Sequence, residues 1–531
     1  MGGATVAEPM QGHRRIKIAI GAGFTSGLLL AAAAPAGLTG WLAWIALVPA
    51  AAAALAWRGT RAGRLAVPVA YGVYLEALLI RALPFGIADG QWGDPPPVMI
   101  GDSPVLLVAS LAVPAFTVLL YAVRFGEPWG LDRLAPGLRP VAAVATPAAA
   151  FAALDFVRVS LDPGGYWGPL FLSQHETGAI SLSVLAGPWL VSFAIAASGY
   201  ALAQLALALS TRTSPGSASG GHARGAVAVA LGTAALIAVG VAAGLSVDRG
   251  GGRSAVVAAV QPGYDTAEED RWQTRHFEPG SYGPAALDLI RDLSPMTREA
   301  TAAGAEIVVW PEAAVWVDPS AGRVGAELRR LASENGAAIV IPYFLRERRQ
   351  GQTTVLLPDG TFTATQAKQR PMWFLGENGD NRAAPEPVSV AGVRMGSMLG
   401  VDNQGPRVAR ALTGDRADLL VSATHDWEQL AGPQRAFAAV NSAATGTPLV
   451  RADWRYGSAI YGPEGDRIAA AGGDLERTVL VASVSLGEGS TPYTEIGDVL
   501  GWLFLALSCA AGAVALAGGY RWSHEPSVAP R

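Results

Sequence analysis

Long apolar runs recur along the first half of the sequence and appear once more near its end. Each is about 20 residues long, the length that an α-helix needs to cross a hydrocarbon core of about 30 Å. Eight such runs lie at 16–36, 39–57, 64–84, 103–123, 140–160, 178–209, 225–246 and 494–519. With 51% hydrophobic and only 15% charged residues, the chain departs from the average soluble protein. The sequence therefore predicts a polytopic α-helical membrane domain with about eight spans.

The charges of the connecting loops predict the orientation of these spans. The loops "WRGTRAGR", "VRFGEPWGLDRLAPGLR" and "STRTSPGSASGGHARG" are basic, and they alternate with "GIADGQWGDPPPVMIGDS", which has no Lys or Arg. By the positive-inside rule both termini are then cytoplasmic. The first run, after "HRRIK", has a signal peptide as its alternative, but a second long run follows directly and favours an uncleaved helix.

Residues 254–487 have a different character, with charges, prolines and short β-rich runs at regular intervals. Examples are "SAVVAAVQPG", "AEIVVWPEAAV", "AAIVIPYFL", "DLLVSATHD" and "RTVLVASVS", with helix-like stretches between several of them. Strands that alternate with helices and hairpin turns predict an α/β domain with a mixed sheet. We expect a membrane domain at 1–248, an extracytoplasmic α/β domain at 249–490, and a last span with a cytoplasmic tail at 491–531.

Composition also excludes several classes of function. A net charge of −4, without a basic cluster interleaved with aromatic residues, gives no sign of a nucleic-acid partner. The single cysteine, Cys509, lies in the last apolar run, so neither an intrachain disulfide nor a cysteine metal site is expected. The six histidines are scattered and lack a metal-ligand spacing. We therefore expect no metal and no cofactor.

Several motifs follow one another in a fixed order. They are "AAVQPG", "VVWPEAAV", a lysine followed by "FLGEN", "VRMGSMLGVDNQGPR", "GPQRAFAAVNSAATGTPLVRAD" and "GPEGDRI". This ordered set resembles the carbon-nitrogen hydrolase (nitrilase) superfamily. In the apolar part, "LDFVRVSLDPGGYWGPLFLSQ", "LAGPWLVSFAIAASGYALAQ" and "STPYTEIGDVLGWLFLAL" resemble apolipoprotein N-acyltransferase, so that the resemblance covers nearly the whole chain.

The resemblance implies an eight-helix membrane domain that carries a nitrilase-like αββα sandwich on the extracytoplasmic face. Members of this family move an acyl chain from a phospholipid, through a cysteine thioester, to the α-amino group of a lipoprotein. The implied partners are phospholipid and a lipoprotein or lipopeptide. A protein partner in envelope lipid or glycolipid synthesis is a further expectation.

Three residues match family positions that carry chemistry. Glu312 stands where the family has its general base, Lys368 where it has the lysine that stabilises the oxyanion, and Glu377 where it has a further glutamate on a covering loop. Each has a plainer alternative, such as a helix-capping carboxylate for Glu312 or a solvated lysine for Lys368. The spacing from Lys368 to Glu377 is one residue longer than the family pattern, so Arg370 remains a rival for the lysine role.

The segment between Lys368 and Glu377 contains three consecutive apolar residues. Met372, Trp373 and Phe374 suit a lid that contacts lipid, with ordinary core packing as the alternative.

The position of the family nucleophile falls on a glycine. Asp402 and Pro406 keep the register of the family's nucleophile turn, and this register places the cysteine position at Gly400. Cys509 cannot take over from within a membrane span. Glycine readily adopts the strained backbone of such a turn, so the fold can persist without the thiol. The resemblance thus implies a family member that lacks its nucleophile.

Three other residues are candidates for compensating chemistry, and a fourth departs from the family pattern. Ser397 lies three positions earlier on the strand and is expected to point to the other face, and Asp402 would be a poor nucleophile toward an ester. His425 is a candidate base, with a surface-loop histidine as its alternative. Arg435 stands where the family pattern does not predict an arginine.

Charges inside the apolar runs form two candidate pairs. Glu76 and Arg81 lie in the third run, and Asp155 and Arg158 end the fifth. Such charges need partners or a lipid headgroup, so each pair could line a lipid access route, with interfacial snorkelling as the alternative.

Three functions remain after this reading. We favour a catalytically impaired apolipoprotein N-acyltransferase-like protein that binds lipid or lipopeptide as a partner or scaffold. The second is an active acyltransferase with a non-cysteine mechanism. The third, an amidase for a soluble substrate, is disfavoured because it too needs the cysteine and has no need of eight spans.

Overall fold

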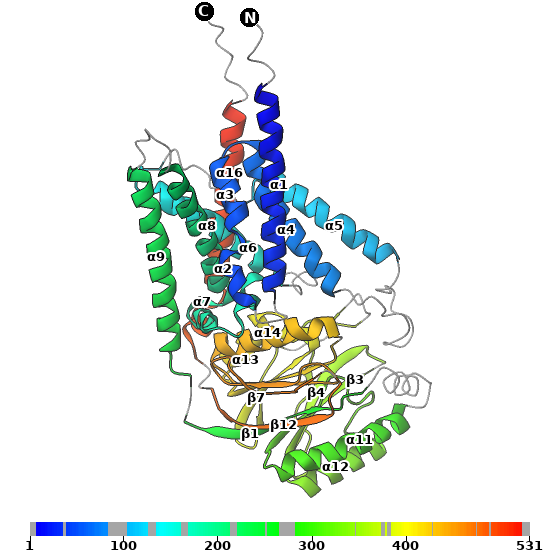
Figure 1. The fold of residues 1–531 in the computed structure, drawn as a ribbon. Helices are drawn as coiled ribbons and strands as arrows, with labels where there is room; N and C mark the ends of the chain where they lie inside the picture. The colour runs from blue at the N-terminus through cyan, green and yellow to red at the C-terminus, as the bar shows by residue number, and fades with distance from the viewer. Residues whose placement is uncertain are drawn as a thin grey trace, which may run out of the picture.

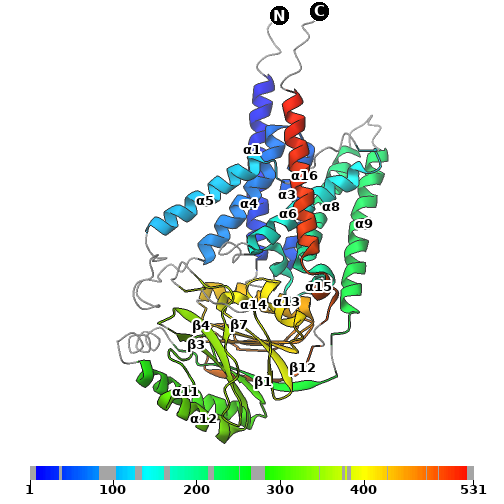
Figure 2. The same cartoon turned by 180° about the vertical axis from the view of Figure 1, so that it is seen from behind.

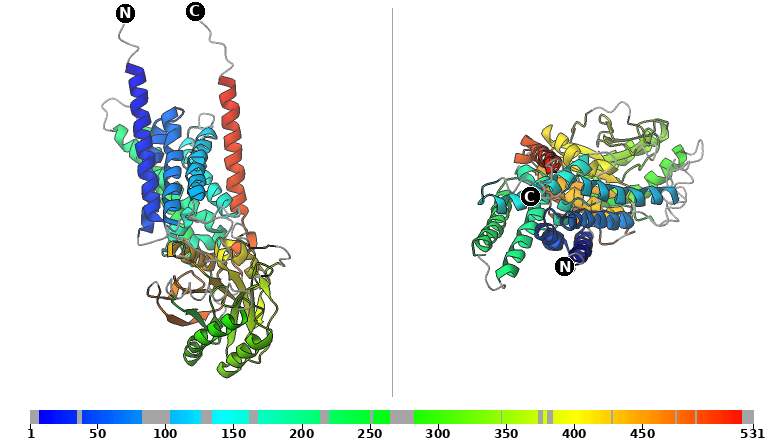
Figure 3. Two further views of the ribbon diagram at one scale, coloured as in Figure 1. Left: turned by 90° about the vertical axis from the view of Figure 1, so that its right-hand side faces the viewer. Right: turned by 90° about the horizontal axis from the view of Figure 1, so that it is seen from above.

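A helical part and an α/β part lie at opposite ends of the protein (Figures 1 and 2). The computed structural model describes residues 7–34, 39–82, 103–125, 134–160, 168–212, 220–249, 252–264, 282–345, 347–372, 377–379, 384–426, 428–473, 475–487 and 490–522. Figure 3 shows the first helix in blue and the last helix in red, and both project away from the α/β part.

The helical part is built from long apolar helices joined by short ones. The long helices are α1 (Ala7–Ala33), α4 (Arg61–Ala82), α5 (Ser103–Ala122), α6 (Arg139–Ser160), α8 (Pro188–Arg212), α9 (Gly220–Leu245) and α16 (Val499–Trp522). The short helices are η1 (Gly40–Leu42), α2 (Ala43–Ala46), α3 (Val48–Ala56), η3 (Leu170–Gln174), η4 (Gly178–Leu182), α7 (Ser183–Ala186) and α15 (Pro492–Ile496). Gly187, with φ of +82°, ends α7, and Pro188 starts α8 because its fixed φ suits a first helical position.

The helices test the expected number of membrane spans. Within the described part of the chain, 5 helices are long and apolar enough to cross a membrane: Gln11–Ala33, Arg61–Arg81, Arg139–Ser160, Pro188–Ser210 and Ala223–Leu245. The other three predicted runs contain shorter apolar stretches, at Gly40–Ala56, Leu111–Ala122 and Val499–Val514. Five spans therefore have support from length and composition, and eight crossings remain a proposal.

Two six-stranded sheets form the centre of the α/β part. The first has the order β12-β1-β2-β3-β4-β5 and the second the order β11-β10-β9-β8-β7-β6. The strands are β1 (Ser254–Gln261), β2 (Ile307–Val309), β3 (Ala338–Leu345), β4 (Gln350–Leu356), β5 (Gln366–Ala367), β6 (Val388–Val390), β7 (Val393–Leu399), β8 (Leu419–Thr424), β9 (Leu449–Asp453), β10 (Ala459–Tyr461), β11 (Arg467–Ala470) and β12 (Thr478–Ser485). Parallel and antiparallel pairs occur in both sheets, which confirms the predicted mixed α/β domain.

Helices cover the outer face of each sheet, and the inner faces pack together. Contacts place α11 (Tyr282–Ala302) and α12 (Gly322–Asn335) on the first sheet and α13 (Pro406–Gly414) and α14 (Glu428–Thr445) on the second. Val257, Val309, Val355 and Val421 are among the residues of the core between the sheets. Because these strands are buried on both faces, they read as nearly continuous apolar runs rather than as alternating ones.

The helix layer of the second sheet also contacts the helical part. Buried residues of α13 and α14, including Leu412 and Phe437, belong to the same hydrophobic cluster as Phe171 and Trp189. The rings of Phe171 and Phe437 lie 6.0 Å apart, edge to face. The helical part and the α/β part therefore share one core.

Asp498 connects the last helix to both parts. Its carboxylate accepts hydrogen bonds from Trp189 Nε1 at 2.9 Å, Tyr493 Oη at 2.7 Å and Arg410 Nη2 at 3.0 Å. Trp189 belongs to α8 and Arg410 to α13. One carboxylate thus links a helix of the apolar bundle to the helix layer of the sandwich.

We predict that Asp498→Ala lowers stability by about 1–3 kcal/mol, because it leaves three donors without their acceptor. Asp288→Ala removes an exposed ion pair with Arg291 and should change stability by no more than about 0.5 kcal/mol. The measurement is thermal unfolding of both variants in the same detergent. Equal melting temperatures for the two variants would show that Asp498 does not fasten the junction.

Candidate active site

Glu312 follows β2 on the edge where the strand ends. Its backbone N–H donates to Thr424 O at 3.4 Å, and its backbone carbonyl accepts from Trp454 Nε1 at 2.7 Å. These bonds tie the segment to the ends of β8 and β9 in the second sheet. The side chain is only 13% exposed, so the carboxylate faces the interior of the sandwich rather than capping a solvent-exposed helix.

Lys368 brings the two predicted glutamates together. It follows the short strand β5, and its backbone N–H donates to Gly351 O at 3.0 Å. Its ammonium contacts Glu312 Oε1 at 3.0 Å and Glu377 Oε1 at 2.7 Å. The Lys368 side chain is 3% exposed, so the solvated-lysine alternative is wrong.

Glu377 is held from both sides of the predicted lid. Its Oε2 accepts from the backbone N–H of Met372 at 2.7 Å, and its own N–H donates to Met372 O at 3.2 Å. Met372 is partly buried, whereas Trp373 and Phe374 lie outside the described residues. The structure therefore describes only the two ends of this loop, Met372 and Glu377, and the lid remains a prediction.

Two carboxylates and one ammonium share this buried space, and their pKa values respond to it. Burial raises the pKa of Glu312, and the Lys368 ammonium offsets this only in part. Burial alone would lower the pKa of Lys368, but the charges of Glu312 and Glu377 hold it above its usual value. The lysine is therefore a permanent cation, suited to holding a developing oxyanion, and Glu312 is the group that can take up a proton.

Gly400 directly follows β7, at the start of the 3-10 turn η6 (Gly400–Asn403), and faces Glu312. Its φ is +48°, a conformation that residues with side chains rarely adopt. A Cβ atom built on Gly400 would lie 2.6 Å from Glu312 Oε2 and 3.0 Å from Glu312 Oε1. The structure thus brings Glu312, Lys368, Glu377 and Gly400 together, and a side chain at position 400 would point at the carboxylate. Their roles in catalysis remain predictions.

Asp402 braces the turn that follows Gly400. Its carboxylate accepts from the backbone N–H groups of Arg370 at 2.6 Å, Gln369 at 3.0 Å and Leu399 at 3.2 Å. Burial raises its pKa to about 6, although these amides and Lys368 oppose the shift. With both oxygens engaged, Asp402 holds the Lys368 loop against the turn and is not placed as a nucleophile.

The other candidates are directed elsewhere. Arg370 donates to Gln404 O and, at 3.5 Å, to Val159 O, so it contacts the turn and α6 and the lysine role falls to Lys368. Ser397 is buried, and its Oγ has no hydrogen-bond partner within the described ranges. Ser397 lies within β7 on the same face as Met395, which is buried in the core between the two sheets, so its side chain points into that core and away from the turn.

His425 interacts with residues of the site, whereas Arg435 interacts with residues elsewhere in the domain. The His425 ring lies 5.9 Å from that of Trp454, and its charge contributes to lowering the pKa of Glu312. Arg435 instead packs against Gly457 and acts electrostatically on His175 and Tyr461. Cys509 is exposed on α16, in a different part of the chain from Gly400.

Sequence reasoning missed a buried polar network beneath the site. Arg451 is fully buried and contacts the carboxylates of Asp426 and Asp453, the latter at 3.3 Å. Asp426 Oδ1 accepts from Gln434 Nε2 at 3.3 Å, and Gln434 in turn accepts from Asn403 Nδ2. Burial raises the pKa of Asp426 to about 7, although Arg451 opposes this. The network connects the turn after Gly400 to the ends of β8 and β9.

The charged residues of the apolar helices have defined contacts. Arg158 Nη1 lies 3.7 Å from Asp155 Oδ1 and donates to Tyr71 Oη at 2.7 Å, whereas Arg81 donates to Ala31 O at 3.0 Å. The neighbouring Val159 on α6 packs against Gly405, where an added Cβ would lie 2.6 Å from its Cγ1. The Asp155 pair therefore lies close to the turn after Gly400, and a role in lipid access remains a proposal.

A group of three or more His, Cys, Asp or Glu side chains suited to a metal ion is absent from the part of the chain that the structure describes. The donor set at Gly400 consists of two carboxylates already engaged by an ammonium. Both carboxylates of the site are thus paired with Lys368, and the expectation of no metal stays a prediction.

Comparisons with known proteins found a family model and several solved structures that resemble part of this chain. A family model described as carbon-nitrogen hydrolase matches residues 257–491. A mutant of the nitrilase-superfamily amidase of Nesterenkonia AN1 aligns at 18% identity and a TM-score of 0.35, covering 46% of this chain and 93% of that one. The carbon-nitrogen hydrolase of Helicobacter pylori G27 aligns at 16% identity and a TM-score of 0.34, covering 48% and 94%.

A comparison with curated protein sequences found no match. The family model spans the two sheets from β1 to β12 and contains Glu312, Lys368, Glu377 and Gly400. The C-terminal half of this chain thus carries a carbon-nitrogen hydrolase domain.

Proposed function

We propose that this chain is an apolipoprotein N-acyltransferase-like membrane protein that binds phospholipid or lipopeptide without transferring an acyl chain. It would act as a partner or scaffold in bacterial lipoprotein or envelope lipid biogenesis. The observation that carries the proposal is the pairing of an assembled site with an absent nucleophile. Glu312, Lys368 and Glu377 surround Gly400, and glycine has no side-chain atom to form a thioester.

The chemistry of acyl transfer explains why the glycine matters. Attack on an unactivated phospholipid ester requires a strong nucleophile such as a thiolate, activated by a nearby base or cation. Asp402 is occupied by three backbone amides, and Ser397 points away. Loss of a nucleophile typically lowers kcat by a factor on the order of 10⁶, so binding would survive where turnover does not.

The long apolar helices support the choice of a lipid ligand. The apolar helices and the α/β domain share one core, and the site lies on the side of the domain where α6 contacts the turn after Gly400. An acyl chain held between the apolar helices would therefore reach the site without leaving a lipid environment. A soluble-substrate amidase has no need of such a junction.

The second candidate is an active acyltransferase that uses a non-cysteine mechanism. Its supporting observation is Glu312, whose raised pKa suits a base that takes a proton from an incoming amine. In direct aminolysis the incoming amine would attack the ester carbonyl, and the Lys368 ammonium would hold the oxyanion. Glu312 would pass the proton of the amine to the departing alcohol of the phospholipid, so that no covalent intermediate with the protein would form. Product analysis separates this candidate from the first.

We predict that the wild-type protein forms no covalent acyl adduct after incubation with phospholipid. Gly400→Cys should form a weak adduct at most, because its Cβ must displace the Glu312 carboxylate from 2.6 Å and adopt a positive φ. Gly400→Ala places the same Cβ without a thiol and is the matched control. Intact-mass spectrometry of the three proteins is the measurement. Complementation of a bacterial strain that lacks apolipoprotein N-acyltransferase accompanies it.

An acyl adduct on the wild type would contradict the proposal. So would wild-type complementation that disappears in Glu312→Ala, since this would assign catalysis to the second candidate.

We predict that Lys368→Met lowers the free energy of unfolding by about 3–5 kcal/mol, because it leaves two buried carboxylates without their cation. Without Lys368, the pKa of Glu312 rises further in the folded state only, so the variant loses stability as pH rises above the usual carboxyl pKa. The difference from wild type should therefore shrink on acidification toward pH ~5. Denaturant unfolding at several pH values tests this.

The double variant Lys368→Met/Glu312→Gln serves as its control. It removes one of the two facing charges and should recover part of the stability at neutral pH. A pH-independent loss that the second substitution does not relieve would show that Lys368 acts through packing alone.

We predict that both termini are cytoplasmic and that the carbon-nitrogen hydrolase domain is extracytoplasmic, from the alternation of basic loops. The outer ends of α1 and α16 point away from the domain in the structure (Figure 3), which fits this arrangement. A reporter fused after Arg531 should be active only in the cytoplasm. Activity outside the membrane would reverse the topology.

A further inference from the structure

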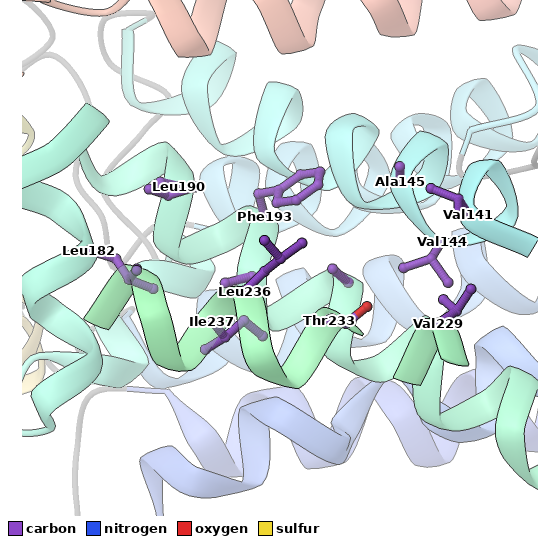
Figure 4. A pocket seen from close by; sticks show the side chains of 13 residues that line it. Val141, Val144, Ala145, Leu182, Leu190, Phe193, Val229, Thr233, Leu236 and Ile237 are labelled. Carbon is purple, nitrogen blue, oxygen red and sulfur yellow. The ribbon is translucent and has the colours of Figure 1, made fainter. Parts of the chain in front are cut away.

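An apolar hollow separates α9 from α6 and α8. Its lining is almost entirely hydrophobic, with Thr233 as the polar side chain among Val141, Val144, Phe193, Leu236, Ile237 and other apolar residues. Figure 4 shows these side chains converging from facing helices. The hollow spans α9 from Val229 to Gly240, about 16 Å along the helix. This is about half of a hydrocarbon core, the depth of one leaflet.

A polar pocket lies just beyond the domain-side end of this hollow. Its lining comes from the η3–η4 segment, the end of α9 and the β10–β11 hairpin, and includes His175, Glu176, Glu464, Asp466 and Arg467. Leu182 and Gly240 line the hollow, while Ser181 and Leu245 line the pocket. The two spaces are therefore about 8 Å apart along α9.

Charges of both signs face the polar pocket. Glu176 pairs with Arg467 at 3.4 Å, which leaves the carboxylates of Glu464 and Asp466 on the hairpin, where both residues are exposed. Arg249 and Arg435 do not line the pocket. Arg249 acts electrostatically on Glu464 and Asp466, and Arg435 acts on His175. Positive and negative groups thus lie side by side, a pattern that complements a zwitterion better than an anion.

We propose that the hollow and the pocket together hold one phospholipid with an amine-bearing zwitterionic headgroup. An acyl chain occupies the hollow along α9. The ammonium lies against Glu464 and Asp466, and the phosphate lies toward Arg467 and His175. The lipid belongs to the leaflet next to the carbon-nitrogen hydrolase domain, and it is bound at a place that shares no residue with the Gly400 site. The inference rests on the membrane insertion in the proposed function.

Two matched pairs of variants test the two halves of this lipid site. Thr233→Trp fills the hollow, whereas Leu231→Trp places the same ring on α9 at a side chain that is 66% exposed and outside the hollow. Glu464→Gln removes a headgroup carboxylate, whereas Glu299→Gln changes an exposed glutamate on α11. Each full-length protein is delipidated in detergent and offered equal amounts of phosphatidylethanolamine and phosphatidylglycerol with distinguishable chains.

Native mass spectrometry then counts the retained lipid. We expect the wild type and both controls to retain one lipid with about a fivefold preference for the ethanolamine headgroup, the size expected for a partly exposed ion pair. Thr233→Trp should abolish retention, and Glu464→Gln should remove the preference while keeping the lipid.

Absence of retained lipid in the wild type, equal retention by Thr233→Trp, or a preference for phosphatidylglycerol would each overturn the inference. None of these results concerns acyl adducts at Gly400, and a wild type that does not sediment with membranes would refute the proposed function instead.

Discussion

The Lys368 ammonium between Glu312 and Glu377 is the interaction on which the candidate site depends. It joins the first sheet, through β5, to the loop that carries Glu377 and to the carboxylate that faces Gly400. Lys17 and Lys368 are the two lysines of the chain, which otherwise uses arginine. The lysine ammonium is a compact charge with three rotatable donors, and here two of its contacts are to Glu312 and Glu377.

The shared core explains how an α/β domain can serve a lipid ligand. The α13–α14 layer packs on the second sheet with one face and on the apolar helices with the other, and Asp498 fastens the last helix to both. The buried network of Arg451, Asp426 and Asp453 then keeps the strand ends beneath Gly400 in place. A site with this support keeps its shape without a nucleophile, because none of these contacts involves a side chain at position 400.

Much of this arrangement was predictable from the order of motifs. Glu312 follows a recognisable strand, Lys368 precedes the motif "FLGEN", and Asp402 and Pro406 set the register of Gly400. Sequence did not separate Lys368 from Arg370, because the direction of a loop side chain depends on the bonds that Asp402 makes to the backbone of that loop. The buried network was missed because its members come from separate segments of the chain.

The central claim is that the site around Gly400 binds a lipopeptide and leaves it unchanged. The most direct test incubates the purified protein with phospholipid and a fluorescent diacylated lipopeptide, then measures saturable binding and the mass of the recovered lipopeptide in the same sample. The account predicts binding that weakens in Lys368→Met, with a lipopeptide of unaltered mass. Recovery of an N-acylated lipopeptide from the wild type, formed faster than in Glu312→Gln, would contradict it.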